Sequence, residues 1–151
     1  VKNDTDMLYA LRRAYDLGYK KIYILGGTGG TRPDHGIANI QCLTWAANRG
    51  MQAYLIGEGY VYTALNKQKL LFPPGYDGTL SVFALSGKCS GVFLSGLLYE
   101  ETDLTITPDY PIGVSNCMLA EGSEVSVKSG TLTVFWEDKP GYKLPDIISC
   151  T

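Results

Sequence analysis

The pattern of hydrophobic residues changes near residue 60, and this change constrains the fold more than any other feature of the sequence. Before it, apolar residues recur at helical spacing in 7–15 and 37–47, and the short apolar runs 21–25 and 52–56 fit buried strands. After it, short alternating runs follow one another without a helical period. Helix, strand, helix, strand is typical of a parallel α/β layer, whereas alternating runs are typical of an antiparallel sandwich.

We therefore predict two structural parts and a tail. Residues 1–66 are expected to form an α/β part, with helices on a parallel sheet that is incomplete at its N-terminal side. Residues 67–138 are expected to form an all-β antiparallel sandwich, and residues 139–151 a loop-like tail. The alternating runs that predict strands are 61–65, 69–72, 79–85, 91–97, 103–107, 124–127 and 131–136.

Composition excludes several classes of function. The chain has 151 residues, of which 45% are hydrophobic, so it can bury a substantial core. Its net charge is −2 without long charged runs, which argues against a nucleic-acid surface, and its apolar runs are too short for a membrane helix. Four scattered cysteines and one histidine do not favour a zinc site. We expect reduced thiols in a cytoplasmic protein, although the sequence leaves a disulfide open.

The segment 24–39, ILGGTGGTRPDHGIAN, carries the strongest signal for chemistry. A strand leads into four glycines within five residues, and an arginine, an aspartate and a histidine then open a helix. A helix N-terminus attracts anions, an arginine can bind phosphate oxygens, and a carboxylate can bind a hard cation. Neither the P-loop nor the dinucleotide GxGxxG spacing fits. The segment therefore predicts a site for a phosphorylated ligand with Mg²⁺.

Each candidate in the first part also has a structural interpretation. Asp34 could simply cap the helix, Asp4-Thr5-Asp6 could cap the preceding helix, and His35 could be an ordinary polar group. The alternative is that Asp6 and Asp34 face one crevice, because loops at the carboxyl ends of parallel strands gather at one edge of the sheet.

Two candidates lie in the second part. Tyr99 follows a strand, where an aromatic side chain either packs at a rim or offers a surface for stacking. Ser115 and Asn116 lie in a loop, where they are ordinary turn residues or ligand contacts.

Taken in order, these segments resemble thiamine pyrophosphokinases of the bacterial type. The resemblance runs from Asp4-Thr5-Asp6 through the glycine-rich segment and Gly96-Leu97-Leu98-Tyr99 to Gly113-Val114-Ser115-Asn116 and the strands of 124–136. It implies an α/β catalytic domain followed by a β-sandwich, and a homodimer with active sites between the subunits. The implied reaction transfers pyrophosphate from ATP to thiamine, giving thiamine diphosphate and AMP.

The resemblance also implies roles for individual residues. Asp6 and Asp34 would hold Mg²⁺, Arg32 would meet the ATP phosphates, and Asp34 could also take the proton of the thiamine hydroxyl. These three residues form the implied catalytic set. The implied substrate-binding residues are Asp4, Thr5, Gly29, Gly30, His35, Asn39, Tyr99, Ser115 and Asn116.

The chain departs from the family pattern in two places. The family has an acidic Gly-Asp-x-Asp-Ser segment upstream of the first aspartates, and this chain contains none. We therefore expect a fragment that lacks about 55–60 residues of a domain of this class. The glycine loop is also one residue longer near Thr31. The alternatives to an enzyme are a ligand-binding or regulatory domain of the same fold and a plain structural module.

Overall fold

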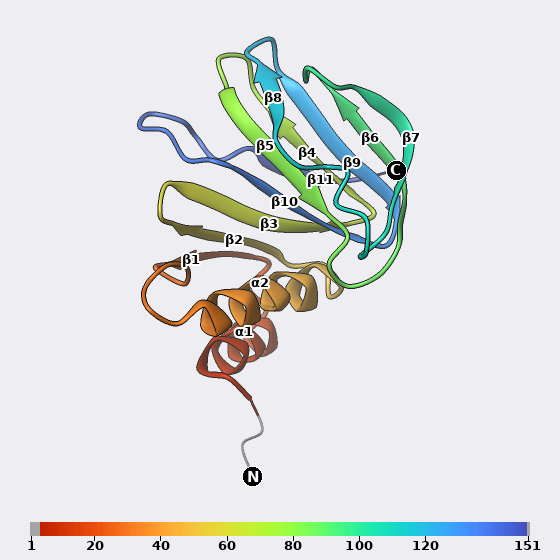
Figure 1. The fold of residues 1–151 in the computed structure, drawn as a ribbon. Coiled ribbons are helices and arrows are strands. Elements are labelled where there is room, and N and C mark those ends of the chain that lie inside the picture. The colour runs from red at the N-terminus through yellow and green to blue at the C-terminus, as the bar shows by residue number, and fades with distance from the viewer. Residues whose placement is uncertain (1–3, 151) are drawn as a thin grey trace.

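The computed structural model describes residues 4–150 and consists of three layers. Two helices pack on one face of a mixed sheet, and a second sheet packs on its other face (Figure 1). The elements are α1 (Asp6–Asp16), β1 (Lys21–Leu25), α2 (Pro33–Ala47), β2 (Gln52–Gly57), β3 (Tyr60–Asn66), β4 (Gln68–Phe72), β5 (Asp77–Phe83), β6 (Cys89–Ser95), β7 (Glu101–Ile106), β8 (Asn116–Leu119), β9 (Ser123–Ser129), β10 (Thr131–Glu137) and β11 (Asp146–Ser149).

The strands form two sheets, which we call sheet A and sheet B. Sheet A has six strands in the order β1-β2-β3-β10-β5-β8, and sheet B has five in the order β11-β4-β9-β6-β7. Only β1 and β2 pair in parallel, and the other pairings between these strands are antiparallel. The predicted fold class, an α/β part with a parallel sheet followed by an antiparallel sandwich, is therefore wrong. The chain is mostly β, and sheet A is mixed and continues from β1 to strands of the second half.

Sheet A is mixed because a tight turn after β2 reverses the direction of the chain, so that β3 pairs antiparallel with β2. Glu58 and Gly59 both have positive φ, at 53° and 77°, and they join β2 to β3 as a two-residue hairpin loop. Such loops need left-handed backbone at both central positions, and Asn-Gly or Asp-Gly is their usual sequence. Because Glu-Gly is a weaker signal, the hairpin was not predicted. The chain then passes from sheet A to sheet B at Lys67, which also has positive φ.

Both helices begin and end where local sequence favours it. Thr5 caps α1, since its Oγ1 accepts a hydrogen bond from the Leu8 amide at 3.2 Å, and Gly18 follows the helix end with φ 86°. Pro33 opens α2 at a position where its missing N–H leaves no hydrogen bond unmade. Leu11 and Leu43 are buried between the helices and sheet A. No helix among residues 4–150 is long and apolar enough to cross a membrane.

Two strand predictions need correction. The run 21–25, predicted as a buried strand, is the edge strand β1, in which Ile24 alone is buried. The tail, predicted as loop-like from residue 139, contains β11, which pairs with β4. The Tyr54 hydroxyl holds this tail by donating to the carbonyl oxygen of Pro145 at 2.8 Å. All four cysteines lie in the described part, and none of them forms a disulfide.

An exposed polar cluster fastens the tail to the start of β5. Asp77 Oδ1 accepts hydrogen bonds from Lys139 Nζ and from the Tyr142 hydroxyl, each at 2.6 Å. The bond from Lys139, and then that from Tyr142, lowers the pKa of the Asp77 carboxyl below its ordinary 3.8. A lowered pKa in the folded state stabilises the protein above the unfolded pKa, and this contribution is lost as the pH falls through the folded pKa.

We accordingly expect Asp77→Asn to lower the free energy of unfolding at pH 7. The difference from the wild type should shrink below pH 3.8, the ordinary pKa of this carboxyl, and vanish once Asp77 is protonated in the folded protein. Urea unfolding measured across this pH range tests the expectation. In a Lys139→Met background, Asp77→Asn should lower the free energy of unfolding by a smaller amount. An equally large decrease there would contradict the stabilisation of the Asp77 carboxylate by Lys139.

Candidate functional site

A cavity of about 430 Å³ opens where β1 ends and α2 begins, and we call it the glycine-loop cavity. The parallel β1–β2 pair brings the carboxyl end of β1 to this point, where ligands of parallel sheets commonly bind. Three segments form its wall: the start of α1, the end of β1 with the following glycines, and the first turns of α2. The lining residues are Thr5, Asp6, Met7, Leu25, Gly26, Gly27, Arg32, Asp34, His35, Ala38 and Asn39.

Gly26 and Gly27 begin the loop after β1, where a larger residue would strain the backbone at position 26 or displace a neighbouring side chain at position 27. A Cβ atom on Gly27 would lie 2.6 Å from Leu55 Cδ1, and Gly26 has φ 69°. Asn39 Nδ2 donates to the carbonyl oxygen of Gly27 at 2.7 Å and so ties the loop to α2. Gly27 was not among the predicted site residues. The close approach that singles it out involves Leu55 of β2, which only the folded chain brings near.

Arg32 and Asp34 form a forked ion pair at the mouth of this cavity. Arg32 Nε and Nη2 donate to the two carboxylate oxygens of Asp34 at 2.9 and 2.6 Å. The guanidinium lowers the pKa of the Asp34 carboxyl, which also makes it a weaker proton acceptor. Both side chains are more than 60% exposed, so the pair is open to a ligand. Helix α2 begins at Pro33, so Asp34 lies inside the first turn and is not the helix cap.

The structure brings six of the predicted site residues together at the glycine-loop cavity and leaves three others of that region outside its wall. Asp4 is turned to Arg12, with which it forms an ion pair at 3.0 Å. Gly29 and Gly30 lie in the loop but do not line the cavity. Among residues 4–150, no three His, Cys, Asp or Glu side chains gather as a metal site. The six lining residues are Thr5, Asp6, Arg32, Asp34, His35 and Asn39.

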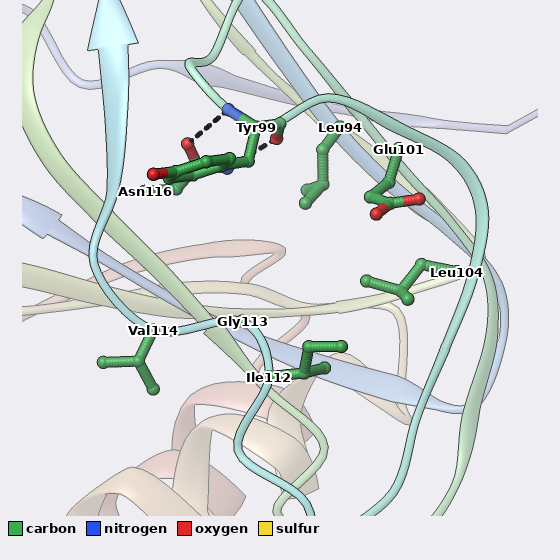
Figure 2. A pocket seen from close by; sticks show the side chains of 8 residues that line it. All are labelled: Leu94, Tyr99, Glu101, Leu104, Ile112, Gly113, Val114 and Asn116. Carbon is green, nitrogen blue, oxygen red and sulfur yellow. Dashed lines mark hydrogen bonds between the residues drawn. The ribbon is translucent and has the colours of Figure 1, made fainter.

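A second cavity, of about 250 Å³, lies in the sandwich, and we call it the sandwich cavity (Figure 2). Of the predicted residues, Tyr99 and Asn116 line it, whereas Ser115 does not. The Ser115 amide instead donates to Ser81 Oγ at 3.0 Å. The lining residues are Leu94, Tyr99, Glu101, Leu104, Ile112, Gly113, Val114 and Asn116.

Glu101 is the charged residue of the sandwich cavity that sequence reasoning missed. Its carboxylate stands beside the apolar side chains of Leu94 and Leu104 in Figure 2. The neighbouring Glu100 is engaged elsewhere, since its Oε1 accepts the Gly96 amide at 2.7 Å. Two adjacent acids after an aromatic residue could have drawn attention to this position. A carboxylate, a tyrosine ring and apolar side chains in one cavity favour a flat ligand that carries positive charge.

The two cavities are separate in the single chain. Among the described residues, none lines both of them. The glycine-loop cavity combines a helix N-terminus, a guanidinium and two carboxylates, Asp6 and Asp34. These groups suit phosphates and a hard cation, whereas the sandwich cavity suits a ring system.

One family model matches the part of the chain that contains the sandwich cavity. Residues 67–132 match the family described as thiamin pyrophosphokinase, vitamin B1 binding domain. That segment contains every lining residue of the sandwich cavity. No curated protein sequence matches the chain.

Solved structures show the same fold over nearly the whole chain. The thiamine pyrophosphokinase of Bacillus subtilis matches with a TM-score of 0.80 and 23% identity over 92% of this chain. That of Geobacillus thermodenitrificans matches with a TM-score of 0.76 and 22% identity over 95% of it. The thiamin pyrophosphokinase of Candida albicans matches less closely, with a TM-score of 0.64 and 19% identity. That match covers 78% of this chain and 44% of the Candida albicans protein. The chain spans 65% and 66% of the length of the two bacterial proteins.

Proposed function

We propose that this chain binds thiamine and takes part in transferring pyrophosphate to it from ATP, because residues 67–132 match the vitamin B1-binding domain family of thiamin pyrophosphokinases. The products are thiamine diphosphate and AMP. The observation that carries the proposal is the sandwich cavity, since its whole wall lies inside the matched segment. Thiamine is a flat cation, with an aminopyrimidine ring and a thiazolium ring, and it suits a wall that offers Tyr99, Glu101 and apolar side chains.

The glycine-loop cavity is the proposed site for the ATP phosphates. The amides at the start of α2 and the guanidinium of Arg32 are the donors that phosphate oxygens require. Pyrophosphoryl transfer depends mainly on positioning and on neutralising charge. In this proposal Arg32 exchanges its carboxylate partner, Asp34, for phosphate oxygens when ATP binds.

Asp6 and Asp34 are the residues that would hold Mg²⁺. Both are oxygen ligands on the wall of one cavity, and Mg²⁺ in such enzymes is held by one or two carboxylates together with substrate phosphates. The donor set therefore fits the ion. When bound, Mg²⁺ would neutralise charge on the phosphate oxygens. The release of Asp34 from Arg32 would make its carboxylate available to the ion.

A homodimer with active sites between subunits is part of the proposal. The phosphate site and the thiamine site lie on cavities with no common lining residue in the described chain. Transfer needs the two substrates in contact, and a second copy can bring its sandwich cavity to the glycine-loop cavity of the first. A symmetric dimer would then carry two such composite sites.

The direct test is AMP release from ATP by the full chain in the presence of Mg²⁺, with and without thiamine. AMP that appears only with thiamine is the expected result. AMP release that does not respond to thiamine, or no release at all, would overturn the proposed transfer.

A ligand-binding domain without transfer is the second candidate. It is favoured by the extent of the family match, which covers the vitamin B1-binding segment and not the glycine-loop region. This candidate predicts that calorimetry detects thiamine binding to a chain that releases no AMP.

The charge of Glu101 should affect thiamine affinity. We expect Glu101→Gln to raise the dissociation constant for thiamine about threefold to fivefold, the range typical of exposed charge pairs. The effect should shrink at high salt, because salt screens such pairs. Titration calorimetry measures the dissociation constants of the wild type and of Glu101→Gln at low and at high salt.

Two controls separate charge from shape in this experiment. Asp103→Asn removes an equal charge from β7 outside the cavity wall and should leave the affinity unchanged. A neutral analogue with a thiophene ring in place of the thiazolium should bind the wild type and Glu101→Gln equally well. If Glu101→Gln lost affinity for thiamine and for this analogue to the same extent, an electrostatic role for Glu101 would be contradicted.

A further inference from the structure

Asn116 is a buried polar residue in the wall of the sandwich cavity. It begins β8, and only 7% of its surface is exposed. A buried amide needs hydrogen-bond partners, because an unpaired one loses the hydrogen bonds that water would provide. The partners of Asn116 show what it does in the fold.

The partners are mainly the backbone of Tyr99. Asn116 Oδ1 accepts the Tyr99 amide at 3.0 Å, and Asn116 Nδ2 donates to the Tyr99 carbonyl oxygen at 2.7 Å. The amide of Cys117 also donates to Oδ1, at 2.9 Å. Only one orientation of the side-chain amide satisfies these contacts, since an N–H must meet the carbonyl and an oxygen must meet the two amides. Figure 2 shows the pair of bonds that clamps Tyr99.

This pairing leaves Asn116 little capacity to hold a ligand. Both acceptor sites of Oδ1 are occupied by backbone amides, and one N–H of Nδ2 is occupied as well. The side chain therefore cannot accept a hydrogen bond from a ligand without giving up one from the backbone.

Tyr99, in contrast, is free to meet a ligand but needs support. Its residue surface is 67% exposed, so its ring is not held by burial in the core. The position of the ring at the cavity wall therefore depends on how firmly its backbone is fixed. Asn116 fixes that backbone on both its donor and its acceptor side.

We propose that Asn116 is a positioning residue for thiamine, which acts by fixing the Tyr99 backbone and so holding the Tyr99 ring at the sandwich cavity. This inference rests on the proposed function for the identity of the ligand. The clamp itself is a property of the fold and can be tested without a ligand.

A double-mutant cycle tests whether Asn116 acts through Tyr99. Tyr99→Ala should weaken thiamine binding about tenfold, as expected for the loss of one stacked ring. Asn116→Ala should weaken it to a similar extent, and the double variant should be no weaker than Tyr99→Ala alone. Titration calorimetry gives the dissociation constants of the wild type, the two single variants and the double variant. Losses that multiply in the double variant would show independent contacts and overturn the proposal.

Hydrogen exchange tests the clamp without thiamine. The Tyr99 amide should exchange faster in Asn116→Ala, while amides of β9 and β10 keep their protection. Unchanged exchange at Tyr99 would overturn the clamp. If the wild type binds no thiamine but exchange responds as expected, the proposed function fails and the positioning of Tyr99 stands.

Asn116→Asp provides a second variant in case Asn116→Ala does not fold. Its carboxylate still accepts the amides of Tyr99 and Cys117 but repels the Tyr99 carbonyl oxygen. Because the added carboxylate would itself attract a cation, this variant is compared with the wild type and Tyr99→Ala by binding of the neutral thiophene analogue. An affinity between those two is expected, and an affinity below that of Tyr99→Ala would contradict the proposal.

Discussion

Gly96→Ala is expected to lower the free energy of unfolding by about 3 kcal/mol, combining left-handed backbone strain with overpacking. Gly96 has φ 67°, a conformation that residues with a Cβ rarely adopt. A Cβ at this position would overlap the carbonyl oxygen of Gly122 and would lie 3.0 Å from the Cα of Ser123. These are backbone atoms, so no flexible side chain can move aside to make room.

Three hydrogen bonds also hold Gly96 in place. Its amide donates to Glu100 Oε1 at 2.7 Å, and its carbonyl accepts Ser123 Oγ at 2.9 Å and the Leu119 amide at 3.2 Å. Any shift that relieves the overlap weakens at least one of them. Because Gly96 begins the loop that carries Tyr99, the same shift should reduce thiamine affinity.

Urea unfolding followed by circular dichroism measures the change in stability. Gly36→Ala is the matched control, because Gly36 lies within α2 and a Cβ there meets no atom within 4 Å. That control should be neutral or stabilising by up to about 1 kcal/mol, the usual difference between alanine and glycine in a helix. A Gly96→Ala protein as stable as the wild type would mean that the backbone around Gly122 leaves room for a side chain at position 96.

The sequence predicted features that depend on neighbours along the chain. The cap of α1 by Thr5 and the stop at Gly18 are local, and both are present. The alternating runs predicted most strands of the sandwich, because alternation follows from burial of one face of a strand. One longer-range feature, the grouping of Asp6 with Asp34, was also predicted. It followed from the rule that loops gather at the carboxyl edge of parallel strands, and both residues line one cavity.

Features that depend on distant pairing could not be predicted in this way. Strand β11 is short and mostly exposed, with Ile147 as its one buried residue, and it is held by β4 and by Tyr54. Strand β10 lies between β3 and β5, which makes sheet A continuous across the predicted boundary. No local pattern records which strands become neighbours. The close approach of Leu55 to Gly27 likewise appears only when β2 comes beside the loop.

Arg32→Lys is expected to lower kcat/KM for ATP by about 10²-fold, because lysine cannot reproduce a forked contact with phosphate or carboxylate. Arg32 makes two bonds to Asp34 and lies at the cavity mouth, with its side chain 66% exposed. Exposure at this level means that the substitution should leave the free energy of unfolding nearly unchanged. Steady-state AMP release with ATP varied and thiamine saturating measures the effect.

Arg13→Lys is the control for this substitution. Arg13 lies in the last turn of α1 and does not line the cavity, so the same chemical change there should leave kcat/KM unchanged. Equal activity of Arg32→Lys and Arg13→Lys would remove Arg32 from the phosphate site.

The Arg32→Lys chain also tests the composite site when it is mixed with Tyr99→Ala. If each active site joins the glycine-loop cavity of one chain to the sandwich cavity of another, a mixed dimer has one site with both defects and one site with neither. With ATP and thiamine both well below saturation, random exchange between equal amounts of the two variants should then restore about a quarter of the wild-type activity. If both cavities of a site come from the same chain, every site in every mixed dimer carries a defect, and activity should stay at the level of the separate variants.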